Sequence, residues 1–188
     1  QRYAGRGVSA CATCDGFFYR KKTVAVVGGG DTACEEASYL SNLADKVYMI
    51  VRKDYLRASK VMQRRVMENQ KIEILFNTNT VGLFGDAKVE GAHLVRFKGT
   101  DREETFDIAI DGFFLGIGHR PNTDIFASQI ALDEQGYIKT DGVTTATNIP
   151  GVFAAGDVAD PRYRQAITSA GMGCKAALDA ERFLVEQE

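Results

Sequence analysis

The stretch Thr23-Val24-Ala25-Val26-Val27-Gly28-Gly29-Gly30-Asp31-Thr32-Ala33 decides the fold of this chain. Its first five residues form a short, mostly β-branched run, which predicts a strand that ends in a tight glycine turn. Residues 31–42 follow with helix formers and with apolar residues spaced for one helical face. A strand, a glycine loop and a helix in this order predict the first unit of a nucleotide-binding α/β domain.

Gly28-x-Gly30-x-x-Ala33 fits the dinucleotide-binding fingerprint, with alanine in the third place. Gly28 permits the tight turn, Gly30 lets the backbone approach a pyrophosphate, and Ala33 lets helix and strand pack closely. The helix start at Asp31 and Thr32 would offer free N–H groups and a positive dipole to the phosphates. The alternative is a glycine turn with a structural role alone.

The alternation of strands and helices continues along the chain. Apolar runs predict strands over 46–51 and 72–76 and a helix over 59–69, so the sheet is parallel with right-handed crossovers. Residues 80–110 alternate loosely between turn signals, which predicts a three-stranded antiparallel meander. A further strand over 112–117 returns to the parallel sheet. The predicted fold class is α/β and Rossmann-like.

A different unit begins after residue 118. It has one predicted strand within 150–157 and one long helix over about 165–185. That is too little sheet to enclose a core, so we expect this unit to complete another domain.

The end of the second strand indicates which nucleotide binds. NAD sites carry an acidic residue there for the ribose hydroxyls, whereas this chain has Arg52, Lys53 and Arg57, with Asp54 among them. Three cations can bind a 2′-phosphate through charge-assisted hydrogen bonds, which favours NADPH. The alternative is a solvated basic loop.

Composition limits the other function classes. The chain has 188 residues, of which 45% are hydrophobic and 26% charged, with a net charge of −2 and no long basic run. We therefore expect no nucleic-acid partner. No apolar stretch approaches a membrane span and no signal peptide opens the chain, which predicts a soluble, cytoplasmic protein without membrane contact.

Cys11 and Cys14 form a Cys-x-x-Cys pair that is followed at once by Asp15. Redox exchange is the main interpretation, because this spacing lowers a thiol pKa and closes a small disulfide ring. Two inert core thiols are the first alternative. A zinc half-site is the second, but it lacks a spaced partner pair, so no metal is expected. Asp15 is either the proton donor and acceptor of this chemistry or a turn or cap residue.

Other candidate residues lie around these motifs. We expect Cys34 and Cys174 to pack within helices and His119 to belong to a loop. The aromatic residues Phe17, Phe18 and Tyr19 are either core or an apolar landing surface for a protein substrate.

Several segments together resemble low-molecular-weight thioredoxin reductases. They are Gly5-Arg-Gly-Val-Ser-Ala-Cys-Ala-Thr-Cys-Asp-Gly-Phe-Phe-Tyr19, the Gly28 loop, Gly151-Val-Phe-Ala-Ala-Gly-Asp-Val158 and Tyr163-Arg-Gln-Ala-Ile-Thr-Ser-Ala-Gly171. The resemblance covers essentially the whole chain. It implies an oxidoreductase in which FAD passes electrons from NADPH to an active-site disulfide, which then reduces thioredoxin. It also implies a homodimer.

The resemblance assigns roles to individual residues. Cys14 would lie next to the flavin, Cys11 would attack the thioredoxin disulfide, and Asp15 would act as acid and base. Phe17 and Phe18 resemble part of the thioredoxin-docking surface. Ile117 and Gly118 match the strand end at the nicotinamide nucleotide. The second FAD-binding segment is matched by Gly156, Asp157, Arg164, Gln165 and Ala166.

Two departures from the family matter. Its common His-Arg-Arg at the 2′-phosphate is Val51-Arg52-Lys53 here, which keeps the charge and makes some NADH use conceivable. The family also opens with an FAD segment that these residues do not include. We therefore expect an NADPH domain over 1–117 and the C-terminal part of an FAD domain over 118–188. We further expect that the chain alone binds NADP(H), holds FAD poorly and does not turn over.

The glycines in 5–7 and 116–119 suit the hinge about which such domains rotate. Two other functions stay open: a reductase of a peroxiredoxin-linked thiol carrier, and a non-catalytic NADP-binding module whose dithiol senses redox state.

Overall fold

A computed structural model describes residues 2–188, and it divides into two compact units. The first ends at Gly118 and the second spans His119–Glu188. Each unit is described by itself below. The assignment of the two units to NADPH and FAD remains a prediction at this point.

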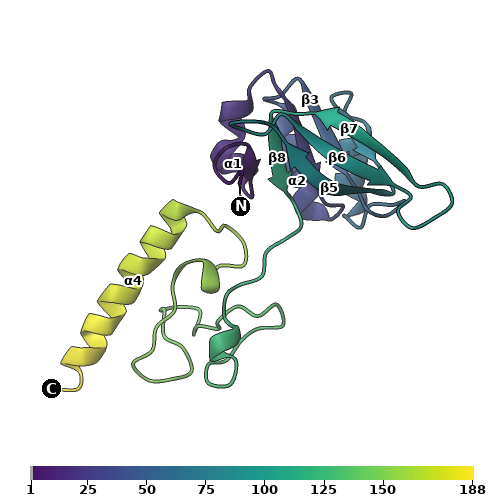
Figure 1. Cartoon of the computed structure of the whole chain (residues 1–188). Coiled ribbons are helices and arrows are strands. Elements are labelled where there is room, and N and C mark those ends of the chain that lie inside the picture. The colour runs from purple at the N-terminus through teal and green to yellow at the C-terminus, as the bar shows by residue number, and fades with distance from the viewer. Residues whose placement is uncertain (1) are drawn as a thin grey trace. The chain divides into compact units, whose positions relative to one another are not determined.

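The first unit is built on a five-stranded parallel sheet (Figure 1). Its strands, in spatial order, are β1 (Val8–Ser9), β8 (Gly112–Leu115), β2 (Thr23–Val27), β3 (Lys46–Ile50) and β4 (Ile72–Leu75). Central β2 pairs with both neighbours, Val24 lying opposite Val47 on β3 and opposite Gly112 on β8. The predicted parallel α/β sheet is confirmed. The two-residue strand β1 was not predicted, because it is too short to show a pattern.

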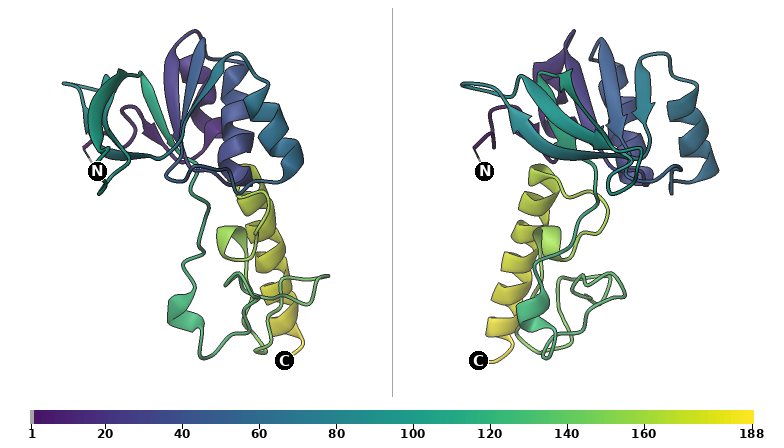
Figure 2. Two further views of the ribbon diagram at one scale, coloured as in Figure 1. Left: turned by 90° about the vertical axis from the view of Figure 1, so that its right-hand side faces the viewer. Right: turned by 45° about the vertical axis from the view of Figure 1, so that its right-hand side comes forward.

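Both faces of this sheet are covered, which explains why the four residues of β2 after Thr23 are all apolar (Figure 2). Helices α2 (Asp31–Ser41) and α3 (Lys60–Met67) bury one face; Val24 and Val26 pack there with Leu40. The other face, which includes Ala25 and Phe113, packs on an antiparallel sheet. That sheet has the order β5 (Thr78–Phe84), β6 (Gly91–Arg96) and β7 (Glu104–Ala109). The predicted meander is confirmed.

A short helical segment precedes β2. It consists of α1 (Ala12–Asp15) and the 3₁₀ turn η1 (Gly16–Tyr19). Gly16 lies against α2, since a Cβ there would come within 3.1 Å of the side chains of Tyr39 and Leu40. The segment is thereby held on the helical face of the sheet.

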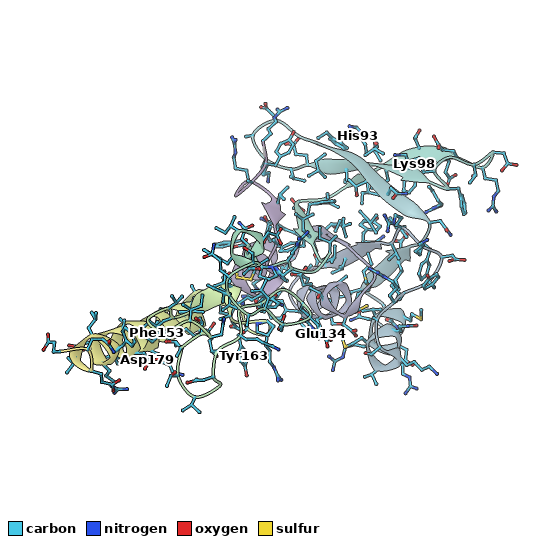
Figure 3. The ribbon with its side chains drawn as sticks, turned by 90° about the horizontal axis from the view of Figure 1, so that it is seen from below. His93, Lys98, Glu134, Phe153, Tyr163 and Asp179 are labelled. Atoms are coloured by element: carbon cyan, nitrogen blue, oxygen red, sulfur yellow. A yellow bond between two sulfur atoms is a disulfide. The ribbon has the colours of Figure 1, made fainter. Side chains whose placement is uncertain are left out.

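The second unit contains the long helix α4 (Ala166–Val185) and the 3₁₀ turns η2 (Asp124–Phe126) and η3 (Gly156–Val158). Phe153 and Asp179 are both labelled along α4 in Figure 3. The Phe153 ring meets Phe183 edge to face at 6.2 Å, and the Asp179 carboxylate accepts hydrogen bonds from the amide and hydroxyl of Thr145. These contacts fasten the loops to the helix.

Two predictions for the second unit are wrong. Residues 150–157 form no strand; Phe153 makes only an isolated bridge with Ala146 before η3 begins. Within the part of the chain that the structure describes, no extended segment runs alongside them to form a ladder. Cys174 is exposed rather than packed, because α4 has no fully buried residue here, whereas Cys34 on α2 is buried as predicted. No helix among residues 2–188 is long and apolar enough to cross a membrane.

Candidate dinucleotide and disulfide sites

The glycine loop after β2 has the close packing that the fingerprint requires. Gly28 has φ +139°, and a Cβ there would collide with the carbonyl oxygen of Gly116 and come within 2.9 Å of Ala33 Cβ. Gly116 meets the same helix, since its own Cβ would lie 2.8 Å from Ala33 Cα. Strands β2 and β8 and helix α2 therefore approach one another at residues without side-chain bulk.

Gly30 has a different role in this loop. It is the N-cap residue of α2 with extended backbone angles, and a Cβ there would meet nothing within 4 Å. Fold packing does not require glycine at this position. The open space above it is where a phosphate could approach the helix N-terminus.

A cavity of about 930 Å³ opens at the carboxyl ends of the parallel strands. The predicted cofactor residues that line it are Gly28, Gly30, Thr32, Arg52, Lys53, Arg57, Ile117 and Gly118. Asp31 and Ala33 do not line it. The cavity lies where the strand order reverses, between β2 and β8, which is the usual ligand site of such sheets.

Asp31 positions the basic loop. Its carboxylate accepts a 2.9 Å hydrogen bond from the Ser59 amide, and this bond lowers the pKa of Asp31. The amides of Arg57 and Ala58 bond to the Gly29 carbonyl at 2.7 and 3.2 Å. The loop that carries the three cations is thus tied directly to the glycine loop.

The sequence analysis missed part of the cavity wall. Tyr55 and one edge of β5, which includes Asn79, Thr80 and Val81, also line it. The Thr80 hydroxyl is buried without a hydrogen-bond partner among the described residues. No local motif marks these residues. The start of β5 is brought to the cavity by hydrogen bonds from the Asn77 and Thr78 amides to the carbonyls of Lys53 and Val51, which follow β3.

Cys11 and Cys14 form a disulfide across α1, with their Cα atoms 5.3 Å apart. Cys11 is the N-cap residue of α1, its sulfur accepting from the Cys14 amide at 3.2 Å, and Cys14 is exposed. Residues 2–188 contain no cluster of three or more histidine, cysteine or acidic side chains that could hold a metal ion. The pairing fits a redox-active centre.

Asp15 and the aromatic residues follow directly. Asp15 makes no side-chain capping bond with η1, so the cap interpretation has no support in the geometry. Phe17 and Phe18 are 64% and 69% exposed, whereas Tyr19 packs edge to face on Phe114 at 5.2 Å. Burial, and then the charges of Asp15 and Asp111, raise the pKa of Tyr19. The aromatic trio divides into one core residue and two surface residues.

The predicted FAD residues gather at the N-terminal end of α4. Gly156, with φ +77°, opens η3, and the Asp157 carboxylate accepts from the Ser169 hydroxyl at 3.1 Å. Gln165 is the N-cap residue of α4 and forms a capping box with Thr168, and Ala166 is the first helical residue. A carboxylate and a helix N-terminus therefore lie together.

Asp160, which the sequence analysis missed, organises the loop before α4. Burial raises the pKa of Asp160, but the hydrogen bonds from the amides of residues 162–164 together lower it by more, so the net shift of the pKa is downward. Arg164, at φ +48°, also donates to the Tyr137 hydroxyl at 3.2 Å and to the Pro161 carbonyl at 2.6 Å. The Asp-Pro pair at 160–161 is typical of a turn and was the signal in the sequence that could have identified Asp160.

Burial and the positive charge of Arg164 lower the pKa of His119, whereas the negative charge of Asp157 raises it.

Comparison with known proteins agrees with this geometry. The family described as pyridine nucleotide-disulphide oxidoreductase matches residues 1–173. The chain is 55% identical over its whole length to the mitochondrial thioredoxin reductase of Kluyveromyces lactis, covering 54% of that protein. It is 56% identical to the thioredoxin reductase of Coxiella burnetii over 97% of the chain and 58% of the relative.

Solved structures give the same result. The thioredoxin reductase of Streptococcus pyogenes matches 96% of the chain with a TM-score of 0.88 and 37% identity, and the chain covers 58% of it. That of Giardia duodenalis matches 96% with a TM-score of 0.84 and 45% identity, again over 58% of its length. The predicted resemblance is confirmed. The chain spans a little over half the length of the relatives it matches.

Proposed function

Because the chain belongs to the pyridine nucleotide-disulphide oxidoreductase family, we propose that it works in the NADPH-dependent reduction of thioredoxin, with FAD as intermediate carrier. One observation carries the proposal: a disulfide in an exposed helical turn belongs to the same unit as a cavity lined by the glycine loop and three cations. Thioredoxin enters because the matched relatives bear that name.

The cavity residues fit NADPH. Gly28 and Gly30 leave room for a pyrophosphate at the start of α2, and Arg52, Lys53 and Arg57 supply positive charge for a 2′-phosphate. Ile117 and Gly118, at the end of β8, would receive the nicotinamide end. Arg52 and Lys53 favour NADPH over NADH, because NADH has no 2′-phosphate to bind them.

The second unit contributes to an FAD site in this proposal. Asp157 would accept hydrogen bonds from hydroxyls of the ribityl chain, and the amides at the start of α4, near Gln165 and Ala166, would face phosphate. Gly156 and Arg164 set the backbone course on either side through their positive φ angles. When bound, NADPH and FAD supply the electrons that reduce the Cys11–Cys14 disulfide.

Thiol–disulfide exchange then falls to this chain's own residues. The Cys11 thiolate attacks one sulfur of the thioredoxin disulfide, and the other sulfur leaves as a thiolate that takes up a proton. The Cys14 thiolate next attacks Cys11, which re-forms the Cys11–Cys14 bond and releases the second thioredoxin sulfur. Asp15, directly after Cys14, exchanges the protons.

Phe17 and Phe18 form the docking surface for thioredoxin in this proposal. Both rings are exposed one turn beyond the dithiol, and the Arg20 guanidinium lies 5.4 Å from the Phe17 ring centre. Exposed aromatic side chains next to a reactive group are typical of interface anchors. We further propose a homodimer and a cytoplasmic location; two matched relatives are named as mitochondrial.

The test is NADPH consumption, with oxidised thioredoxin, by the FAD-loaded full-length protein that contains these residues. We expect turnover that is lost in Cys11→Ser and in Cys14→Ser. The matched control is Cys174→Ser, because Cys174 is an exposed cysteine in the other unit. Cys14→Ser should also trap a mixed disulfide between Cys11 and thioredoxin.

Other outcomes would redirect the proposal. Turnover with a peroxiredoxin-linked carrier but not with thioredoxin would indicate a different protein substrate. Tight NADPH binding without any disulfide reduction would indicate a redox-sensing module and contradict the enzymatic role.

A further inference from the structure

A half-buried carboxyl contacts the first turn of α1 and has no role in the steps above. Glu36 is on α2, and its Oε1 accepts a hydrogen bond of 3.3 Å from the Ala12 amide, the first helical residue of α1. Its other oxygen, Oε2, is buried without a hydrogen-bond partner among the described residues. A half-satisfied buried carboxyl is costly to keep, so it calls for a reason.

The Glu36 carboxyl and the Cys11 sulfur both accept hydrogen bonds from backbone amides of α1. The amide of Ala12 donates to Glu36, and the amide of Cys14 donates to the sulfur of Cys11 at 3.2 Å. Two acceptors thus share the N–H groups at the start of α1. When the disulfide is reduced, a thiolate would form on the turn that Glu36 contacts. The Glu36 carboxyl is either ionised or protonated, and its state would affect that thiolate.

We propose that Glu36 is a positioning residue that holds the first turn of α1 through the Ala12 amide and whose charge sets the acidity of the reduced dithiol. An ionised Glu36 disfavours a neighbouring thiolate, and a protonated Glu36 does not. Reduction of the disulfide by two electrons and one proton yields a thiol and a thiolate.

The surroundings of Glu36 support such a role. Burial raises the pKa of Glu36, and the hydrogen bond from the Ala12 amide lowers it by less, so the net shift is upward. Beyond Glu36, the titratable groups on α2 and on the elements packed against it are Asp31, Cys34, Glu35 and Tyr39 on α2, Cys11, Cys14 and Asp15 at α1, Tyr19 on η1, Lys46 and Tyr48 on β3, Glu73 on β4, and Lys60, Arg64 and Arg65 on α3. Burial and the Ala12 amide are the two influences that move the pKa of Glu36.

The experiment compares Glu36→Gln with the unchanged chain. Glutamine keeps an oxygen for the Ala12 amide and removes only the charge. The matched control is Glu35→Gln, which removes the same charge one residue earlier on α2 from an exposed side chain. Each chain is reduced with dithiothreitol, freed of it and treated with iodoacetamide from acid to neutral pH. Mass spectrometry then gives the alkylation rate of the peptide that contains Cys11 and Cys14.

The expected result is a ratio of rates that depends on pH. Near neutral pH, Glu36→Gln should be alkylated about fivefold faster, because the thiolate no longer faces a carboxylate. In acid, where Glu36 is protonated, the two rates should converge. Glu35→Gln should follow the unchanged chain throughout.

Three results would overturn the proposal. The first is equal rates at every pH. The second is a constant ratio at every pH, which would indicate a purely structural role. The third is an equal effect of Glu35→Gln, which would indicate the general charge of α2. The measurement uses neither NADPH nor FAD, so its failure is distinguishable from failure of the proposed function on which it rests.

Discussion

At the scale of single residues, Gly28 and Gly30 have different roles in the glycine loop. The fold requires glycine at position 28, whereas glycine at position 30 leaves space for a cofactor. Gly28 has a positive φ and no room for a Cβ, whereas Gly30 has extended backbone and open space. Gly28→Ala should therefore lower the free energy of unfolding by about 2–4 kcal/mol, since it combines backbone strain with a steric clash. Urea unfolding measures this loss.

Gly30→Ala is the matched variant. It should leave the free energy of unfolding within about 1 kcal/mol and weaken NADPH binding by about tenfold, because the new methyl group occupies the pyrophosphate approach. Equal effects of the two substitutions on unfolding would contradict these separate roles.

Asp160 offers a second test at the residue scale. Its carboxylate accepts the amides of Arg162, Tyr163 and Arg164 at 2.8–2.9 Å, and its pKa is lowered overall. A lowered native pKa stabilises the folded loop above the unfolded pKa of about 3.9, and this stabilisation is lost as the pH falls through the native value. Hydrogen-exchange protection of these three amides should therefore decrease in that acidic window.

Asp160→Asn keeps one acceptor oxygen and removes the titration. Its three amides should be less protected at neutral pH, and their protection should no longer change in acid. If the unchanged chain kept full protection below its native carboxylate pKa, Asp160 would not be the group that holds this loop.

At the scale of elements, the turn η1 presents two aromatic rings to solvent and buries a third. Phe17→Ala and Phe18→Ala should leave the unfolding free energy nearly unchanged, because the rings are mostly exposed. Each should slow thiol exchange between the chain's disulfide and reduced thioredoxin about tenfold, if the rings anchor the partner. Exchange with dithiothreitol is the control and should not change. Equal slowing with both reductants would place the effect on the disulfide rather than on docking.

The elements also show what the sequence could predict. The strand, glycine loop and helix from Thr23 to Ala33 form a local pattern, and the parallel sheet and meander followed from patterns of the same kind. The strand expected within 150–157 failed because a strand requires a neighbour, which local residues do not reveal. Cys174 failed for the same reason, since small residues on a helix indicate packing only if a covering element is present.

At the scale of the whole chain, the cavity and the disulfide belong to the first unit, and the predicted FAD residues gather in the second, apart from it in the chain. Tyr55 and β5 could not be assigned to the cavity from sequence, because only the connection of β5 to the end of β3 brings them there. The assignment of Asp31 to cofactor binding stays a prediction; its carboxylate accepts from the Ser59 amide and Asp31 does not line the cavity. Side chains that act through another residue leave no motif of their own.

The central claim is that this chain selects NADPH to supply electrons to its disulfide, and calorimetric titration of the chain with NADPH and NADH at one fixed salt concentration tests it most directly. We expect NADPH to bind at least tenfold more tightly than NADH, and Arg52→Ala to remove most of that difference while NADH binding stays unchanged. The control is Arg64→Ala, an exposed arginine on α3 that does not line the cavity. Failure of both nucleotides to bind, or equal binding of both to the unchanged chain, would contradict the account.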